Sequence, residues 1–380
     1  MAQRQFASGD TSTWAEKYGN GSDGAVTISA DTTDSSRSGY ANTTISATLG
    51  STSATVGSGT GFAANDLVII HQSRNGGTGV GNWELNKISS VGGGTNWTLA
   101  YSTIYAYDTT AQVYHLVQNS AITINSAQTL TGVAWNSTTG GIVALLCNGI
   151  VTVTGNITVA SKGYVGPAEN SSGDGSQGEG TLGAGSANSN STNGNGAGGG
   201  TNGADAKHGG GGGGGHANDG NAGSTAGQGT GGVAGLGSVG NTALTSAVFG
   251  GGGGTCPFNT SGTGGQGGGF ILIIAKTINV TGTIVADGES PTRSNAGGGA
   301  GGSVLLKGQS ITLGTTLVTA NLGTGNNTSD ANNGAGGNGA VGRIHADYSG
   351  SISGTTNPTI DSTQDATLGE GRSGTQSKIW

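Results

Sequence analysis

Residues 208–216 read HGGGGGGGH, a run of seven glycines between two histidines. The run lies in residues 161–270, which hold 41 of the 83 glycines of this 380-residue chain. Other tracts occupy residues 194–200, 227–232, 250–254, 264–269, 297–302 and 334–339. Glycine ordinarily supplies about 7% of a globular protein. Glycine at this density must form either a flexible linker or the packed core of an ordered structure.

Three structures are open to the glycine tracts. A flexible linker is the first, although a structureless segment of about 100 residues inside a domain would be unusual. The second is an ordered, irregular glycine-rich β-roll. The third, which we favour, is a bundle of polyglycine II helices with the polyproline II geometry of three residues per turn. Because that helix makes no internal hydrogen bonds, its N–H and C=O groups can pair only with neighbouring helices.

The glycine tracts are flanked by a repeated strand unit. Each unit has a glycine pair, an apolar strand and then an alternating strand with a Thr-Gly or Leu-Gly step. The units begin at residues 140, 268 and 301, and a weaker copy begins at residue 342. Since the spacing between units is irregular, we expect stacked sheet strands that clamp a glycine core rather than a repeat of fixed period.

The first third of the chain has a more ordinary composition and reads as short β-strands. β-branched runs bounded by Gly, Asn, Asp and Ser predict strands at residues 25–29, 43–49 and 66–71, followed by alternating segments up to residue 117. We predict a small β-barrel or sandwich over residues 59–118. The predicted domains are an N-terminal β domain for attachment or assembly (1–135) and a glycine-rich polyglycine II and β domain (136–380). The fold class is all-β with essentially no α-helix.

Composition excludes several classes of protein. Collagen is excluded because proline is scarce, with 4 residues, and glycine has no three-residue period. With 13 basic residues and a net charge of −7, the chain lacks the basic patch of a nucleic-acid-binding protein. No apolar run reaches the roughly 20 residues of a membrane span, and no signal peptide is expected. The two cysteines, Cys147 and Cys256, leave a single bridge as an open alternative.

The strand and glycine pattern resembles the glycine-rich tail-fibre and adhesin proteins of tailed bacteriophages. The matching text is residues 153–157 (VTGNI) and 280–284 (VTGTI), with an N-terminal phrase at residues 19–28 (GNGSDGAVTI). The resemblance is architectural and covers roughly residues 136–350. It implies a sandwich of polyglycine II helices whose connecting loops recognise a receptor on the bacterial host.

A second resemblance is to bacterial cell-surface proteins with glycine-rich tails. It rests on residues 66–72, 112–114 and 140–143. Such proteins normally carry an export signal, so its expected absence favours a virion tail protein, or otherwise an extracellular one.

Catalysis is not expected. The five histidines lie in separate contexts, and His345 with Asp347 is the closest pairing with a carboxylate, without a third partner. His71 and His115 fall on predicted strands and are interpreted as structural. No catalytic residue, metal site or cofactor is predicted.

Recognition is the stronger hypothesis, because bulkier residues interrupt the glycine tracts where bundle ends should lie. The candidate receptor-binding residues are Lys207, His208, His216, Phe249, Phe258 and Asn259. Aromatic and amide side chains at loop tips suit a sugar or a loop of an outer-membrane protein. The alternative for Phe249 and Phe258 is that they only fill the edge of the bundle.

The sequence therefore predicts a non-enzymatic structural and host-recognition protein of a phage tail fibre. Its expected partners are a host cell-surface receptor and other fibre subunits, in a homo-oligomer or filament, without nucleic acid or a membrane span. The alternative is a self-assembling extracellular filament or cell-surface structural protein, which would polymerise on its own through edge strands.

Overall fold

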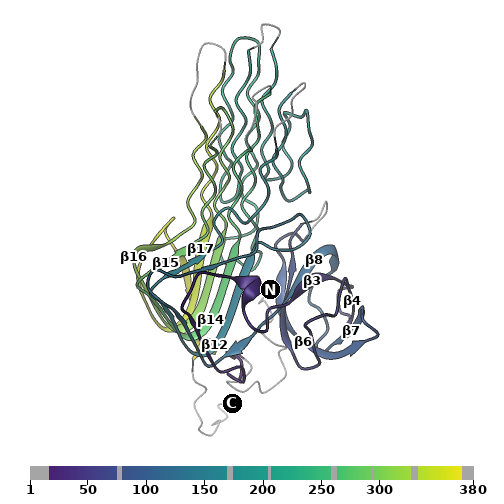
Figure 1. The fold of residues 1–380 in the computed structure, drawn as a ribbon, viewed down its shortest axis with the longest axis vertical. Helices are drawn as coiled ribbons and strands as arrows, with labels where there is room; N and C mark the ends of the chain where they lie inside the picture. The colour runs from purple at the N-terminus through teal and green to yellow at the C-terminus, as the bar shows by residue number, and fades with distance from the viewer. Residues whose placement is uncertain are drawn as a thin grey trace, which may run out of the picture.

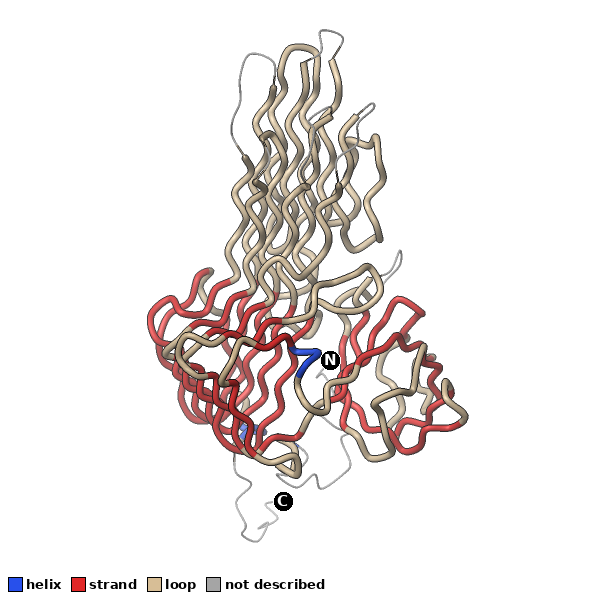
Figure 2. The backbone as a smooth tube through the Cα atoms, viewed as in Figure 1, coloured by secondary structure: helices blue, strands red, loops and turns tan. Residues whose placement is uncertain are grey.

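The computed structural model describes residues 17–74, 79–168, 174–203, 207–257, 263–292, 294–326 and 333–369. The prediction of an all-β protein is confirmed: helix is nearly absent, with single 3₁₀ turns at η1 (Asp34–Ser36) and η2 (Ala366–Leu368). Figure 1 shows a barrel and a parallel sheet side by side, with a column of extended segments projecting from them. Figure 2 shows that this column contains almost no strand.

The parallel sheet is a stack of rungs, each made of a strand, a tight turn and a second strand. The first strands of successive rungs are β1 (Ala25–Ile28), β10 (Ala121–Ile124), β12 (Ile142–Val153), β14 (Phe270–Val280), β16 (Ser303–Thr319) and β17 (Arg343–Asn357). The second strands are β2 (Thr32–Thr33), β11 (Thr129–Thr131), β13 (Asn156–Thr158) and β15 (Thr283–Val285), which pairs with the second half of β16. Short strands β9 (Gln118–Asn119) and β18 (Asp361–Gln364) pair with β12 and β17.

The repeated units of the sequence account for this stack. Their apolar strands are β12, β14, β16 and β17, and they pair in parallel with aligned aliphatic side chains. One column runs through Val151, Ile278, Ile311 and Ile352. The first three of these side chains are buried in the main apolar cluster and Ile352 packs against it. A burial of this kind stabilises a fold by roughly 25 cal/mol per Å² of apolar surface.

The Thr-Gly step makes the turn between the two strands of a rung. A Cβ on Gly282 would lie 1.9 Å from the carbonyl oxygen of Gly155, the equivalent glycine of the rung before. Only glycine therefore allows the turns to stack this closely.

The barrel is closed by six antiparallel strands in the order β3-β4-β7-β6-β5-β8. They are β3 (Asn42–Ala47), β4 (Ser53–Val56), β5 (Leu67–Gln72), β6 (Trp83–Gly92), β7 (Asn96–Leu99) and β8 (Tyr107–His115). The barrel thus begins before residue 59 and takes in two strands that the predicted range omits. It is an insertion between the first and second rungs, and the sheet itself continues across residue 135.

The column is held together by backbone hydrogen bonds that rotate among neighbours. The N–H groups of residues 209–215 donate to three segments in turn, and each segment recurs at every third residue. The accepting carbonyls, in order, are those of Thr201, Ser224, Asn295, Gly198, Asn221, Gly298 and Asn195.

The carbonyl groups of the same segment follow the same rotation on its other sides. Those of residues 210–215 accept, in order, from the N–H groups of Gly232, Gly337, Gly254, Gly235, Ala340 and Gly251. Six neighbouring stretches of chain therefore surround residues 209–215. The N–H groups of all seven glycines and the carbonyls of the last six are paired, as burial requires.

Close packing explains why these seven positions are glycine. A Cβ at any position from 209 to 215 would lie 1.9–2.2 Å from a backbone carbonyl oxygen of a neighbouring segment. A backbone atom cannot move aside as the end of a flexible side chain can. The two cysteines are both free and buried, so the open alternative of a bridge is resolved against it.

Gly213→Ala tests this close packing. Its Cβ would lie 1.9 Å from the Asn338 oxygen, whereas a Cβ on Gly92, in the barrel, meets nothing nearer than 3.2 Å. We expect Gly213→Ala to lower the free energy of unfolding by about 3 kcal/mol, because overpacking forces the backbone to shift. Gly92→Ala, the control, should change it by less than about 1 kcal/mol. Denaturant unfolding measures both, and equal stability of the two variants would contradict the close packing.

Candidate functional site

The column has a base at the sheet and a free end away from it. His216 lies at the base, where its Nε2 is 3.2 Å from Oγ of Ser303, the first residue of β16. The chain between His216 and His208 is the seven-glycine segment, so His208 lies at the opposite end of the column.

Lys207 and His208 lie at this free end. The N–H of Gly203 donates to the carbonyl of Lys207 at 2.7 Å. His208 Nδ1 lies 3.1 Å from Asn202 Oδ1, and the Lys207 side chain packs over Gly227. Both residues are partly exposed.

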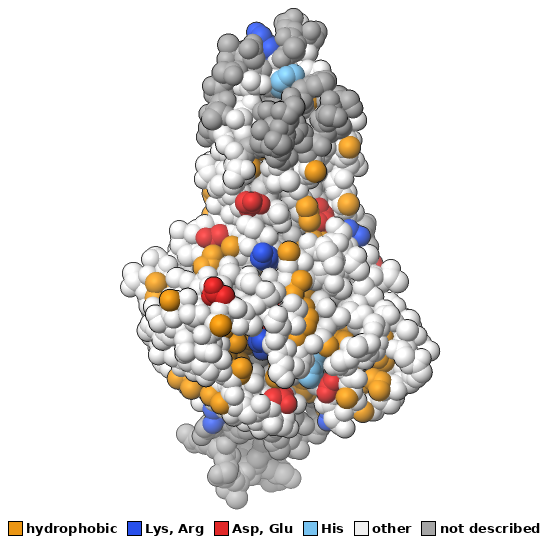
Figure 3. Space-filling view, in the orientation of Figure 1, with side chains coloured by type: hydrophobic (Ala, Val, Ile, Leu, Met, Phe, Trp, Pro, Cys, Tyr) orange, Lys and Arg blue, Asp and Glu red, His pale blue; other side chains and the backbone are white. Residues whose placement is uncertain are grey.

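The side chains around Lys207 and His208 are polar and small. The N–H of Asn202 donates to Asp174 Oδ1 at 3.0 Å, and the N–H of Thr230 donates to Thr201 Oγ1 at 2.6 Å. Partial burial lowers the pKa of His208, which keeps the ring neutral at pH 7. The described end therefore offers one ammonium, one carboxylate and several amide and hydroxyl groups. Figure 3 shows that most of the visible column is neither charged nor hydrophobic.

The prediction that His216 and Phe249 lie at exposed loop tips is wrong, because both side chains are fully buried. Phe249 packs edge-on against Trp135 and Tyr164, with ring centroids 5.5 and 5.4 Å away, and stacks on His71 at 5.5 Å. At this point the glycine column meets the apolar sheet, and large side chains fill the space that glycine leaves. The interpretation of Phe249 as packing was the better one. Phe258 and Asn259 lie outside the described residues.

Residues 244–249 join the barrel, the sheet and the column. His71 of the barrel donates from Nε2 to the carbonyl of Ala247 at 2.7 Å. His216 Nε2 and Ser303 Oγ both lie within hydrogen-bond distance of the Val248 carbonyl, at 2.9 and 2.8 Å. Asn195 of the column donates to the carbonyl of Phe249 at 3.0 Å. Three consecutive carbonyls therefore bind three different parts of the molecule, and this junction mounts the column rigidly on its base.

The junction histidines are neutral. Burial lowers the pKa of His71 to about 4 and that of His216 to about 3. A backbone carbonyl accepts at Nε2 of each ring, so that nitrogen carries the proton. The interpretation of His71 as a structural residue agrees with this geometry.

His345 and Asp347 acquire partners that the sequence does not mark. His345 Nε2 is 3.1 Å from Asp347 Oδ1, and its Nδ1 is 2.8 Å from Asp361 Oδ2 on β18. Lys307 on β16 pairs with the other oxygen of Asp347. These four side chains form a hydrogen-bonded row across β16, β17 and β18. His345 is only 1% exposed, and its contacts with Asp347 and Asp361 tie β18 to the sheet.

A charged pair also lies at the opposite edge of the sheet. Arg37 Nε is 2.5 Å from Asp34 Oδ1, in the turn that follows β2. Arg37 lines the same pocket as Ala25 and Val26 of the edge strand β1. Both ends of the stack thus have ion pairs beside them.

No protein-family model matches the chain, and neither a curated protein nor a solved structure matches it. In the described ranges no helix is long and apolar enough to cross a membrane. Nor do those ranges bring together three His, Cys, Asp or Glu side chains that could hold a metal ion.

Acid should weaken the junction. The unfolded state binds protons on histidine near pH 6.5, whereas folded His71 and His216 bind them only near pH 4 and 3. Stability is therefore full above about pH 6.5 and falls as the pH drops, by about 1 kcal/mol per histidine per pH unit. Urea unfolding between pH 7.5 and 4.5 measures this slope. His71→Gln should remove about half of it, and a slope that the substitution leaves unchanged would refute the assignment.

Proposed function

We propose that the column is a bundle of polyglycine II helices. The three-residue rotation of donors and acceptors along residues 209–215 supports this geometry, because a polyglycine II helix turns once every three residues. At a rise of about 3.1 Å per residue, the eight steps from His216 to His208 would span roughly 25 Å. The helices would form a stiff core in which hydrogen bonds between chains offset the entropy lost by ordered glycine.

We further propose that the protein is a non-enzymatic recognition subunit of a phage tail fibre. The observation that carries this proposal is the column itself, which is mounted on a packed base and holds a polar end away from it (Figure 1). A stiff spacer with a small polar end is suited to contact with a surface. The receptor would be a sugar or an exposed loop of an outer-membrane protein, and Lys207 and His208 would contact it. The location would be the virion tail, or otherwise extracellular.

The self-assembling filament is a less favoured function. Addition of another copy to the parallel sheet would require an open edge at each end of the stack. The Asp34–Arg37 pair beside β1, and β18 with its charged row beside β17, resemble the devices by which proteins protect sheet edges. Electron microscopy of the purified chain separates the two functions, because only the filament requires polymerisation.

Hydrogen exchange tests the helix bundle directly. We expect the amides of residues 209–215 to exchange as slowly as those of β14, because each donates to a neighbouring segment. A flexible glycine linker would exchange within seconds at neutral pH, and such rapid exchange would exclude the bundle.

Cell binding tests the recognition role. Fluorescently labelled protein should bind saturably to at least one strain of a panel of bacteria, and Lys207→Ala with His208→Ala should weaken this binding about tenfold. Lys276→Ala, a change of the same charge on β14, is the control and should bind as the parent does. The recognition role fails if no strain is bound, or if the tip and control variants bind equally.

A further inference from the structure

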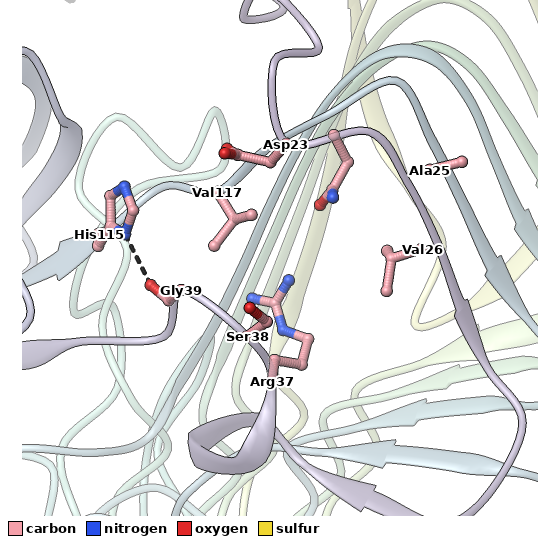
Figure 4. A pocket seen from close by; sticks show the side chains of 9 residues that line it. Asp23, Ala25, Val26, Arg37, Ser38, Gly39, His115 and Val117 are labelled. Carbon is pink, nitrogen blue, oxygen red and sulfur yellow. Dashed lines mark hydrogen bonds between the residues drawn. The ribbon is translucent and has the colours of Figure 1, made fainter.

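A pocket of about 290 Å³ lies between the barrel and the first rung of the sheet, away from the free end of the column. Figure 4 shows its walls: Arg37, Ser38 and Gly39 from the turn after η1, His115 and Val117 from the end of β8, and Asp23, Ala25 and Val26 from the first rung. Asn119 of β9 completes the lining. The pocket is therefore built where three separate parts of the chain meet.

Arg37 is the central polar group of this pocket. Its side chain is only 7% exposed, and its Nε is held by the buried Asp34 carboxylate at 2.5 Å. The outer nitrogens Nη1 and Nη2 have no partner among the described residues. Figure 4 shows the guanidinium pointing into the pocket. These nitrogens are not among the buried polar atoms that lack a partner, so they reach the solvent of the pocket, where an acceptor on a ligand can replace water.

An acceptor lies across the pocket from Arg37. Asp23 Oδ2 accepts from the N–H of Gln118 at 2.7 Å, which fixes the carboxylate and leaves Oδ1 available. The buried Oδ1 of Asn119 also lacks a partner. Val26 and Val117 give the wall between them an apolar surface. The pocket thus offers a donor fork on one side and acceptors on the other.

His115 is not expected to bind a ligand in this pocket, because both of its ring nitrogens face groups of the protein. Its Nδ1 donates to the carbonyl of Gly39 at 2.6 Å, and its Nε2 lies 3.6 Å from Asp66 Oδ1. The ring therefore serves as a fixed wall.

From this arrangement we infer that the pocket binds a small ligand carrying a carboxylate at one end and a hydrogen-bond donor at the other. The carboxylate matches the planar fork of Arg37, which accommodates two parallel N–H···O bonds. The donor, an ammonium or a hydroxyl, faces Asp23. An α-amino acid and a single acidic sugar residue share this chemistry, and the volume suits one such unit. This site is independent of the proposed recognition by the free end.

Calorimetric or NMR titration of the full chain with L-serine and with D-glucuronate tests the inference. At least one should bind saturably at up to about 10 mM, a range typical of weak single-residue ligands. Binding of serine alone identifies a free amino acid as the ligand class, and binding of glucuronate identifies an acidic sugar. Serinamide and glucose, which lack the carboxylate, should bind at least about tenfold more weakly.

Three variants and one matched control make the test specific. Arg37→Lys keeps a cation beside Asp34 but loses the fork, and should weaken binding about tenfold. Ser38→Trp, at an exposed position on the wall, should abolish it by filling the space. Asp23→Asn should weaken binding, whereas the matched Asp31→Asn on the same rung should leave it unchanged. The inference is overturned if neither carboxylate binds, if glucose binds as tightly as glucuronate, or if Ser38→Trp binds as the parent does.

Discussion

A core without side chains must provide a hydrogen-bond partner for its buried backbone N–H and C=O groups, and this requirement governs the structure. Residues 209–215 are surrounded by six stretches of chain, and hydrogen bonds in rotation pair the N–H of every glycine and the carbonyls of residues 210–215. Apolar burial supplies little there, since glycine has no side chain to bury. Cohesion in the column must come from hydrogen bonds that form only if the neighbours approach within the distance that a Cβ would prevent. Glycine is thus required by packing rather than by flexibility.

The sheet and the column are stabilised by different interactions. In the sheet, aliphatic columns such as Val151, Ile278 and Ile311 bury apolar surface rung upon rung. The same rungs fix where the chain enters and leaves the column, because residues 159–269 run from β13 to β14, residues 286–302 from β15 to β16 and residues 320–342 from β16 to β17. A hydrogen-bonded bundle of ordered glycine pays a high entropic cost, and the fixed ends reduce the freedom each segment must lose. Residues 244–249 add side-chain hydrogen bonds from the barrel, the sheet and the column at a place where the three meet.

The sequence predicts individual strands well, because a strand is marked by the pattern of its own residues. The strand units at residues 140, 268 and 301 became β12, β14 and β16, because glycine pairs and alternating apolar residues mark strands independently of their partners. The strands of the barrel could also be predicted, but its insertion into the sheet could not, since β1 and β10 are far apart in the chain and meet only through register. Asp361 was missed as a partner of His345 for the same reason. No short-range signal in the sequence marks Arg37 as the floor of a pocket.

The errors on His216 and Phe249 have a more specific cause. Both residues interrupt glycine tracts, and an interruption marks an end of a segment without saying which end it is. Ends at the base are buried and filled by large side chains such as Phe249, whereas ends at the tip carry small polar groups such as Asn202 and Thr201. An interruption by an apolar residue next to a strand unit should therefore be assigned to the base. Residues 209–215, inside the column, cannot take a larger side chain without a clash, so side-chain variation in the column is restricted to its outward-facing positions, such as Val233 and Leu236, and to its ends.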